Sequence, residues 1–358
     1  MPLGFSPEAC LYQGTSPAEQ GQQTRHLGTG KRSRCRYGVT NIYRTVNRAY
    51  GRWQDMSLSF IRRLTMPLPD LERYYREQRK KRFERGHQSK NIRLREWCYP
   101  IFRAFLVMDR QFRKQTITII NPPPKEKKQF IFACTHIGEN DLESIYEKLG
   151  RGCWWFVGDP CFMYRNISGL FVYLNGVMFL DTGDKDDRRI AYLRSVDLLK
   201  AGGSLMIYPE GARNGSENLP VMPLFSGSAK MAMETDTPII PVAIEQYDKR
   251  FVINFGSELH TEDFRSSAEL TQTLRDAMAT LKWGIWEQEG IQSRADIPED
   301  YSEQFIRQFA QRLYPYDTLE SVERTRYHTK EEMEQREAFA HLDRLIPCKG
   351  NAFLLRKR

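Results

Sequence analysis

Two residues in the stretch FIFACTHIGENDLES, at positions 130 to 144, have the types and the spacing that acid–base chemistry needs. His136 ends a run of apolar, strand-forming residues, and Asp141 follows it five positions later. Residues at this spacing lie on different sides of a helix and on opposite faces of a strand, so only a turn brings their side chains together. Gly138 and Asn140 favour such a turn. The sequence therefore predicts His136 at the mouth of a strand and Asp141 in the first turn of the next helix.

A carboxylate beside a histidine has a known catalytic use. It fixes the tautomer of the imidazole and raises its basicity, so that the other ring nitrogen can take a proton from a hydroxyl group. The alternative interpretation is a surface histidine near an aspartate that caps a helix. We predict no metal site, because one His-x4-Asp pair supplies only two ligands.

A second stretch, SLMIYPEGARNGS at 204 to 216, also consists of an apolar strand that breaks into a turn. Pro209 and Gly211 shape this turn and leave Glu210 and Arg213 as ionisable groups at the edge of the sheet. An arginine at such a place can bind a phosphate through two parallel hydrogen bonds. The alternative is a salt bridge between Glu210 and Arg213 that only holds the turn.

Both stretches belong to a region in which predicted strands and helices alternate. The predicted strands lie near residues 129–134, 153–157, 177–181, 204–208, 239–244 and 251–255. The predicted helices lie near residues 141–149, 162–174, 185–201 and 226–235. This alternation is typical of an α/β fold with a largely parallel central sheet flanked by helices. His136 would then lie at the carboxyl end of a strand, where such folds form their ligand crevice.

The rest of the chain differs from this α/β domain, which we assign to residues 115–260. Residues 1–40 are rich in small and polar residues and are expected to form a flexible lead. Residues 41–114 interleave aromatic and aliphatic residues with arginines and are expected to form a basic amphipathic helical module. Residues 261–358 are expected to form a helical C-terminal extension.

The positive charge of the chain is concentrated near its N-terminus. Residues 1–128 contain 27 Lys and Arg against 10 Asp and Glu, or +17, while residues 129–358 contain 27 against 35, or −8, which together give the net charge of +9. Such a basic part can face nucleic acid, an acidic protein or an anionic membrane, or it is a solvated helical face. The apolar run from Trp97 to Met108 is shorter than the ~20 residues that span a bilayer, and it could lie in a membrane interface.

The seven cysteines indicate a reduced compartment, because they are scattered and form no CxxC pair. The N-terminus lacks a basic region followed by an apolar one, so secretion is not expected. Cys134 offers a rival chemistry, since on a strand it would point to the same side as His136. Its position inside an apolar strand favours a buried, inert thiol instead.

Two further stretches are GVMFLDTGD at 176–184 and TPIIPVAIEQY at 237–247. With all four stretches taken together, the sequence resembles the glycerolipid acyltransferase superfamily. It is most similar to the lysophosphatidate (1-acyl-sn-glycerol-3-phosphate) acyltransferases, and the resemblance covers roughly residues 115–260. The four family motifs correspond in chain order to His136 with Asp141, Gly176 with Phe179 and Leu180, Tyr208 to Asn214, and Ile239 to Val242. Thr182 stands where the second motif has an arginine that helps hold the acceptor's phosphate. Either Arg188 or Lys185 substitutes for that arginine, or the acceptor has a different headgroup.

The resemblance implies an O-acyltransferase that needs no cofactor. His136, oriented by Asp141, would deprotonate the hydroxyl of a lysophospholipid such as lysophosphatidic acid, which then attacks an acyl-CoA or acyl carrier protein thioester. Arg213 would bind the acceptor's phosphate, Glu210 would contact the acceptor's hydroxyl or brace Arg213, and backbone donors near Gly211 would stabilise the oxyanion.

The same resemblance implies contact with an anionic membrane surface through the basic module. We expect a peripheral or monotopic protein on the cytoplasmic side of a membrane, with no nucleic acid partner. Two alternatives stay open. The basic module could belong to a non-catalytic protein that binds nucleic acid or an acidic partner, although this leaves the four ordered motifs unexplained. An acyltransferase could also act on a non-glycerolipid acceptor.

Overall fold

A single mixed sheet organises the part of the chain that the structure, a computed structural model, describes. The described residues are 65–84, 92–138, 140–158, 177–180, 182–216, 219–290, 296–313 and 318–330. They all belong to one compact unit, Ser59–Arg358. The predicted flexible lead, the predicted helix at 162–174, and Gly176 lie outside the described residues.

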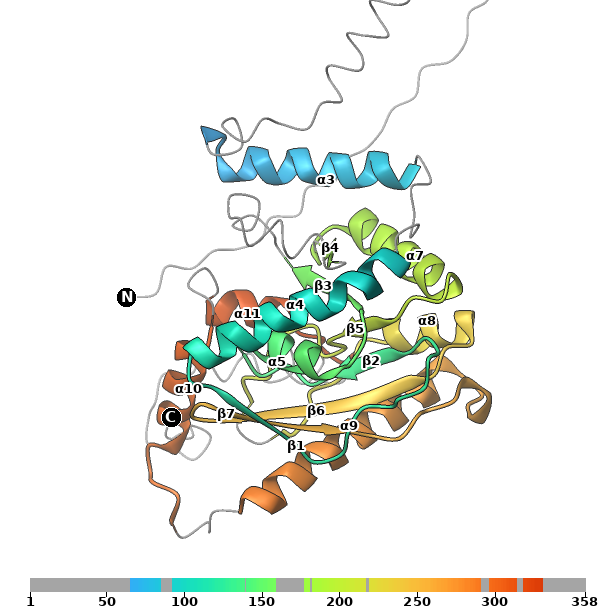
Figure 1. The fold of residues 1–358 in the computed structure, drawn as a ribbon. Helices are drawn as coiled ribbons and strands as arrows, with labels where there is room; N and C mark the ends of the chain where they lie inside the picture. Colours follow the sequence, from blue (N-terminus) through green and yellow to red (C-terminus); the bar gives the residue numbers. More distant parts are fainter. Residues whose placement is uncertain are drawn as a thin grey trace, which may run out of the picture. The chain divides into compact units, whose positions relative to one another are not determined.

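Seven strands form the sheet in the order β1-β7-β6-β2-β5-β3-β4 (Figure 1). Their bounds are Thr116–Ile119 (β1), Ile131–Cys134 (β2), Trp154–Gly158 (β3), Val177–Leu180 (β4), Leu205–Ile207 (β5), Ile239–Tyr247 (β6) and Arg250–Phe255 (β7). The neighbouring pairs are parallel except β6 and β7, which form an antiparallel hairpin. The predicted α/β class with a largely parallel sheet is therefore confirmed.

Strand β1 was not predicted. Its four residues, TITI, are too few to show a reliable period, and they alternate between exposed and half-buried positions. They form a strand because they pair in parallel with β7, which lies more than a hundred residues later in the chain. The partner strand, and not the local pattern, decides the conformation of this segment.

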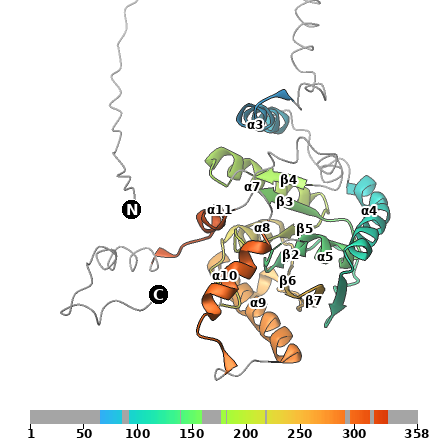
Figure 2. The ribbon, with the colours of Figure 1, turned by 90° about the vertical axis from the view of Figure 1, so that its left-hand side faces the viewer.

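Helices cover both faces of the sheet. Their bounds are Leu68–Glu84 (α3), Ile92–Phe112 (α4), Asp141–Lys148 (α5), Lys185–Lys200 (α7), Gly227–Thr235 (α8), Ser267–Glu289 (α9), Tyr301–Gln311 (α10) and Leu319–Thr325 (α11). Figure 2 shows α4 on one side of the sheet and α7, α8 and α9 on the other. The fold thus has three layers, with the sheet in the middle.

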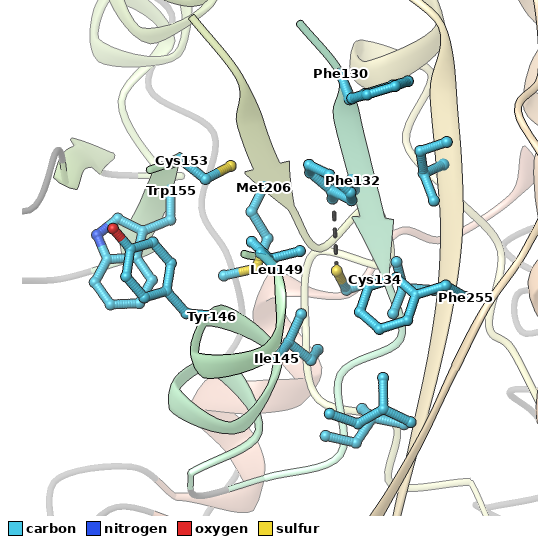
Figure 3. Packing of buried hydrophobic residues seen from close by; sticks show 14 of the residues in the cluster. Phe130, Phe132, Cys134, Ile145, Tyr146, Leu149, Cys153, Trp155, Met206 and Phe255 are labelled. Atoms are coloured by element: carbon cyan, nitrogen blue, oxygen red, sulfur yellow. Dashed lines mark hydrogen bonds between the residues drawn. The ribbon is translucent and has the colours of Figure 1, made fainter. Parts of the chain in front are cut away.

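Strand β2 runs through the centre of the sheet and ends just before His136. Phe130, Phe132 and Cys134 pack in the layer that contains α5, as Figure 3 shows, and Ile131 and Ala133 pack in the opposite layer. All five side chains are buried. A shift of β2 by one residue would move each of these two sets of side chains to the opposite layer. The packing of both sets therefore fixes where the strand ends and where His136 lies.

Helix α4 is attached to α5 through its polar and aromatic face. The Tyr99 hydroxyl donates to the Tyr146 carbonyl at 3.0 Å and accepts from the Gly150 N–H at 2.9 Å. The Arg110 guanidinium donates to the Glu147 carboxylate at 2.8 Å. Pro100 lies inside the helix, which continues on both sides of it. Among the described residues, no helix is both long and apolar enough to cross a membrane.

Candidate active site

His136 and Asp141 are in direct contact at the carboxyl end of β2. The His136 Nδ1 and Asp141 Oδ2 atoms are 2.7 Å apart. The same Oδ2 atom accepts hydrogen bonds from the Ile137 N–H at 2.9 Å and the Gly138 N–H at 3.2 Å. Asp141 is the first residue of α5, and Asn140 before it takes the left-handed conformation that closes the turn, with φ 67°. The predicted placement of the two residues is confirmed.

Asp141 is held as a carboxylate despite its burial. Burial alone would raise its pKa, but the charge and hydrogen bond of His136 together with the N–H groups of Ile137 and Gly138 hold the pKa below its usual value of 3.8. The positive end of α5 adds to this effect. A negative charge next to Nδ1 keeps the proton on that nitrogen, which leaves Nε2 available as a base.

Tyr208, the residue that follows β5, contacts both members of the pair. Its ring stacks on the His136 imidazole with centroids 4.2 Å apart, and its hydroxyl donates to Asp141 Oδ1 at 3.4 Å. Tyr208 had no predicted role of its own. The only available signal was its place in the third motif, immediately before Pro209 and Glu210.

Glu210 ties the loop after β5 to the loop after β2. One carboxylate oxygen accepts from the His136 N–H at 3.2 Å and the other from the Met222 N–H at 2.8 Å. The side chain is completely buried, and burial raises its pKa to about 7 against the opposing effect of these two N–H groups. In this structure Glu210 therefore braces the loops. Its contact with an acceptor hydroxyl stays a prediction.

The turn after Glu210 joins the segment that contains Arg213 to the loop that carries His136. The Asn214 N–H, next in the chain, donates to the His136 carbonyl at 2.7 Å. Gly211 has φ 74°, a conformation that favours glycine, and its N–H donates to the Tyr208 carbonyl at 3.1 Å. The Gly211 N–H thus closes the turn, and the stabilisation of the oxyanion by backbone donors near Gly211 stays a prediction.

Thr182 and Arg188 lie farther from His136. Both are exposed in the segment that follows β4, and the Arg188 guanidinium donates to the Thr182 carbonyl. Strand β4 is separated from β2 by β5 and β3 in the sheet order. Three strand spacings correspond to about 14 Å. The structure therefore does not bring these two residues next to the His136–Asp141 pair, and their predicted contact with the acceptor remains a prediction.

Two other chemistries receive no support from the described residues. Cys134 is buried in the layer between β2 and α5 (Figure 3), and this burial raises the pKa of its thiol well above the usual value. A thiol of this kind is a poor nucleophile, because the thiolate is the reactive form. In the described part of the chain, no cluster of three or more His, Cys, Asp or Glu side chains is arranged to hold a metal ion.

Parts of the chain are similar to known proteins. A sequence model of the family described as Acyltransferase matches residues 113–245. An uncharacterized acyltransferase of Schizosaccharomyces pombe is 25% identical over 162 residues, which are 44% of this chain and 56% of that protein. A 1-acyl-sn-glycerol-3-phosphate acyltransferase of Saccharomyces cerevisiae is 22% identical over 41% of this chain and 46% of its own length.

Two further proteins are similar to parts of this chain. A 1-acyl-sn-glycerol-3-phosphate acyltransferase of Borreliella burgdorferi is 27% identical over 33% of this chain and 44% of its own length. The chain thus spans about half the length of the curated relatives it matches. The crystal structure of the 1-acyl-sn-glycerophosphate acyltransferase PlsC of Thermotoga maritima is similar with a TM-score of 0.45 and 17% identity, over 62% of this chain and 91% of that one.

Proposed function

We propose that this chain, in which residues 113–245 match the model of the acyltransferase family, transfers a fatty acyl group from a thioester to the free hydroxyl of a lysophospholipid such as lysophosphatidic acid. One observation carries the proposal: the buried Asp141 carboxylate lies 2.7 Å from His136 Nδ1 at the carboxyl end of β2. The names of the yeast and Borreliella relatives support the choice of acceptor.

His136 is the general base of the proposed reaction. With the proton on Nδ1 held by Asp141, Nε2 removes the proton from the acceptor hydroxyl as its oxygen attacks the thioester carbonyl. The tetrahedral intermediate then collapses, the carbon–sulfur bond breaks, and the leaving thiolate takes the proton from the imidazolium. The products are the ester and the free thiol, and His136 returns to its starting state. A general base of this kind contributes about 10²- to 10⁴-fold in rate.

The thioester donor in this proposal is acyl-CoA or acyl carrier protein. Both carry the same reacting group, so the same residues serve either one, and no cofactor takes part. Holding the hydroxyl and the thioester together increases the rate of acyl transfer further, because well-oriented reactants reach effective molarities of about 10⁵ M or more.

Arg213 is the proposed ligand of the acceptor's phosphate. Its loop is joined to the loop of His136 by the hydrogen bond from the Asn214 N–H to the His136 carbonyl. A guanidinium group can hold two phosphate oxygens at once, which orients the acceptor as well as binding it. The phosphate would then be held on the side of β5, the strand next to β2 in the sheet.

Helix α4 provides the proposed contact with a membrane surface. Its exposed face carries five large apolar side chains that recur every three or four residues, Trp97, Ile101, Phe105, Met108 and Phe112. The basic residues nearby add about 1 kcal/mol each of attraction to an anionic surface. We propose that this face lies on the bilayer, with the protein peripheral or monotopic on the cytoplasmic side.

Vesicle binding tests the membrane contact. Replacing Trp97 and Phe105 with Ser is expected to reduce co-sedimentation with phosphatidylglycerol vesicles. The matched control is Trp283→Ser, which changes an exposed tryptophan on α9. Unchanged binding of the Trp97 and Phe105 variant would contradict a membrane role for α4.

An acyl-transfer assay tests the activity. The purified protein is offered a panel of lysolipids with labelled acyl-CoA or acyl carrier protein, and the products are separated by thin-layer chromatography. His136→Ala is expected to lower kcat by at least about 10²-fold. His260→Ala is the matched control, because the His260 side chain is 45% exposed and contacts Glu258. A His136→Ala protein that keeps its activity would end the proposed mechanism.

A further inference from the structure

The C-terminal segment, defined here as residues 296–313 and 318–330, lies outside the region that the family model matches. The end of its helix α10 nevertheless contacts both loops of the site. A Cβ atom placed on Gly138, in the loop after β2, would lie 3.1 Å from the Arg312 Cβ and 3.3 Å from the Arg312 carbonyl oxygen. A Cβ atom on Gly215, in the loop after β5, would lie 2.9 Å from the Phe309 ring. Helix α10 thus packs directly on the backbone of both loops.

The contact at Gly138 lies next to the carboxylate of the pair. The Gly138 N–H donates to Asp141 Oδ2 at 3.2 Å, and this is the oxygen that lies 2.7 Å from His136 Nδ1. Gly138 is buried, with the Arg312 backbone on one side of it. Close packing leaves little room for displacement, so this contact restricts where the Gly138 N–H lies.

The contact at Gly215 lies next to the backbone of His136. Gly215 follows Asn214, whose N–H donates to the His136 carbonyl at 2.7 Å. The Phe309 ring, which is 6% exposed, packs on Gly215 and so limits the positions that the preceding Asn214 N–H can take. The carbonyl of His136 is therefore tied to a segment that α10 supports.

Phe309 also supports the residue that holds the His136 N–H. It belongs to a buried cluster that joins the loop after β5 to the C-terminal segment, Ala212, Met222, Phe309, Leu313 and Val322. The Met222 N–H donates to one carboxylate oxygen of Glu210 at 2.8 Å, and the other oxygen accepts from the His136 N–H at 3.2 Å. Both backbone hydrogen bonds of His136 thus lead to segments on which Phe309 packs.

We propose that the end of α10 positions the catalytic pair, with Phe309 as the main positioning residue. Phe309 acts through Gly215 and Met222, and not on the reacting atoms. It keeps the backbone of His136 where the imidazole meets Asp141. This inference rests on the proposed function, and it adds a positioning element from outside the region shared with the family. Residues 113–245 alone then lack one support of the pair.

Gly215→Ala tests the contact, because the added Cβ atom meets the far edge of the Phe309 ring. The nearest ring atoms, Cε1 and Cζ, would lie 2.9 and 3.1 Å from it. Gly215 has no positive φ, so alanine can adopt its backbone conformation. Phe309→Leu removes these two ring atoms and makes room for the added atom. The matched control is Gly227→Ala, at a position where an added Cβ atom would meet nothing within 4 Å.

Gly215→Ala is expected to lower kcat about tenfold to a hundredfold, because a small displacement of a catalytic group has effects of this size. The KM values for acceptor and donor should change little. The ring ¹⁵N chemical shifts of His136, measured by NMR at constant pH without substrate, should move toward those of an imidazole with mixed tautomers. The His136→Ala protein identifies the His136 signals. Adding Phe309→Leu to Gly215→Ala should restore both kcat and the shifts.

Three results would overturn the positioning role. In an active protein, one is a kcat of Gly215→Ala equal to that of Gly227→Ala. The second is a set of His136 shifts equal to that of Gly227→Ala, which with a lower Tm would leave Phe309 a structural role only. The third is a loss that Phe309→Leu does not restore.

The proposed function fails separately from this inference. A wild type that transfers no acyl group would reject the transfer reaction. If its His136 shifts nevertheless move in Gly215→Ala and return with Phe309→Leu, the positioning of His136 by α10 would stand.

Discussion

The loops after β2 and β5 are each followed or formed by one buried carboxyl group, Asp141 and Glu210 respectively. The pKa values of these two groups are shifted in opposite directions. Asp141 is 1% exposed and Glu210 is 0% exposed, so the degree of burial is the same. The pKa of Asp141 is nevertheless below its usual value, whereas burial raises the pKa of Glu210 to about 7. The neighbouring groups, and not burial, account for the difference.

The two pKa values differ because Asp141 has a cationic partner in direct contact. Asp141 contacts His136 directly and also accepts two backbone N–H groups. Glu210 also accepts two backbone N–H groups, but Lys282 and Arg275 lower its pKa only through weaker charge interactions. A buried carboxylate beside an imidazole can stabilise the imidazolium that forms when His136 takes a proton. A buried carboxyl group without such a partner serves to hold backbone groups in place.

The largest effect is expected for Asp141→Asn. The amide cannot stabilise the imidazolium and can favour the wrong tautomer of His136, so kcat should fall by about 10²- to 10⁴-fold. Asp186→Asn is the control, because the Asp186 side chain is 75% exposed. Steady-state kinetics measures the effect, with wild type and both variants compared at the same fraction of folded protein. An Asp141→Asn protein with nearly wild-type kcat would mean that the charge of Asp141 plays no part in catalysis.

Glu210→Gln should change how stability depends on pH. The folded protein holds the Glu210 proton up to about pH 7, whereas the unfolded chain releases it near the usual pKa of 4.5. The stability contributed by this group is therefore complete below pH 4.5 and is lost as pH rises to about 7. The difference in free energy of unfolding between wild type and Glu210→Gln should shrink by about 3 kcal/mol over this range.

Urea denaturation at a series of pH values measures this difference. The exposed Glu262→Gln serves as the control, and it should differ from wild type by a constant amount. A constant difference for Glu210→Gln as well would show that Glu210 is ionised throughout. The contrast between the two buried carboxyl groups would then be lost.

Arg213→Lys tests whether the loop after β5 binds phosphate in addition to bracing the site. The substitution keeps the charge but loses the planar fork of donors. The KM for a phosphorylated acceptor should rise roughly tenfold to a hundredfold, while the KM for the donor changes little. Arg265→Lys, at an exposed position, is the control. Equal changes in both constants with a lower Tm would assign Arg213 a structural role.

The smallest effect is expected for Tyr208→Phe. This change removes the 3.4 Å hydrogen bond to Asp141 Oδ1 and keeps the ring stacked on His136. Because the bond is long, kcat should fall only about threefold. Tyr208→Ala, which also removes the stacked ring, should cost more. If Phe and Ala reduce kcat equally, the stacking contributes nothing.

Local features of the sequence were sufficient to predict much of the α/β domain. The apolar run that ends at His136 and the turn residues Gly138 and Asn140 predicted the strand, the turn and the start of α5. These features involve neighbours in the chain, so they are visible in a short window. The family resemblance, which rests on motif residues in chain order, is confirmed by the match to residues 113–245.

Other features depend on contacts between distant parts of the chain, and no short window of sequence contains them. Strand β1 forms because β7 is its partner, and the distance of Thr182 from His136 follows from the order of strands in the sheet. The stacking of Tyr208 on His136 joins residues 72 positions apart by sequence number, 136 and 208. The contact of Thr325 with Gly211 likewise needs the C-terminal segment folded back on the loop after β5. The sequence by itself determined which residues end the strands, whereas packing decided which of those ends meet, because strand order and long-range contacts arise only when the whole core assembles.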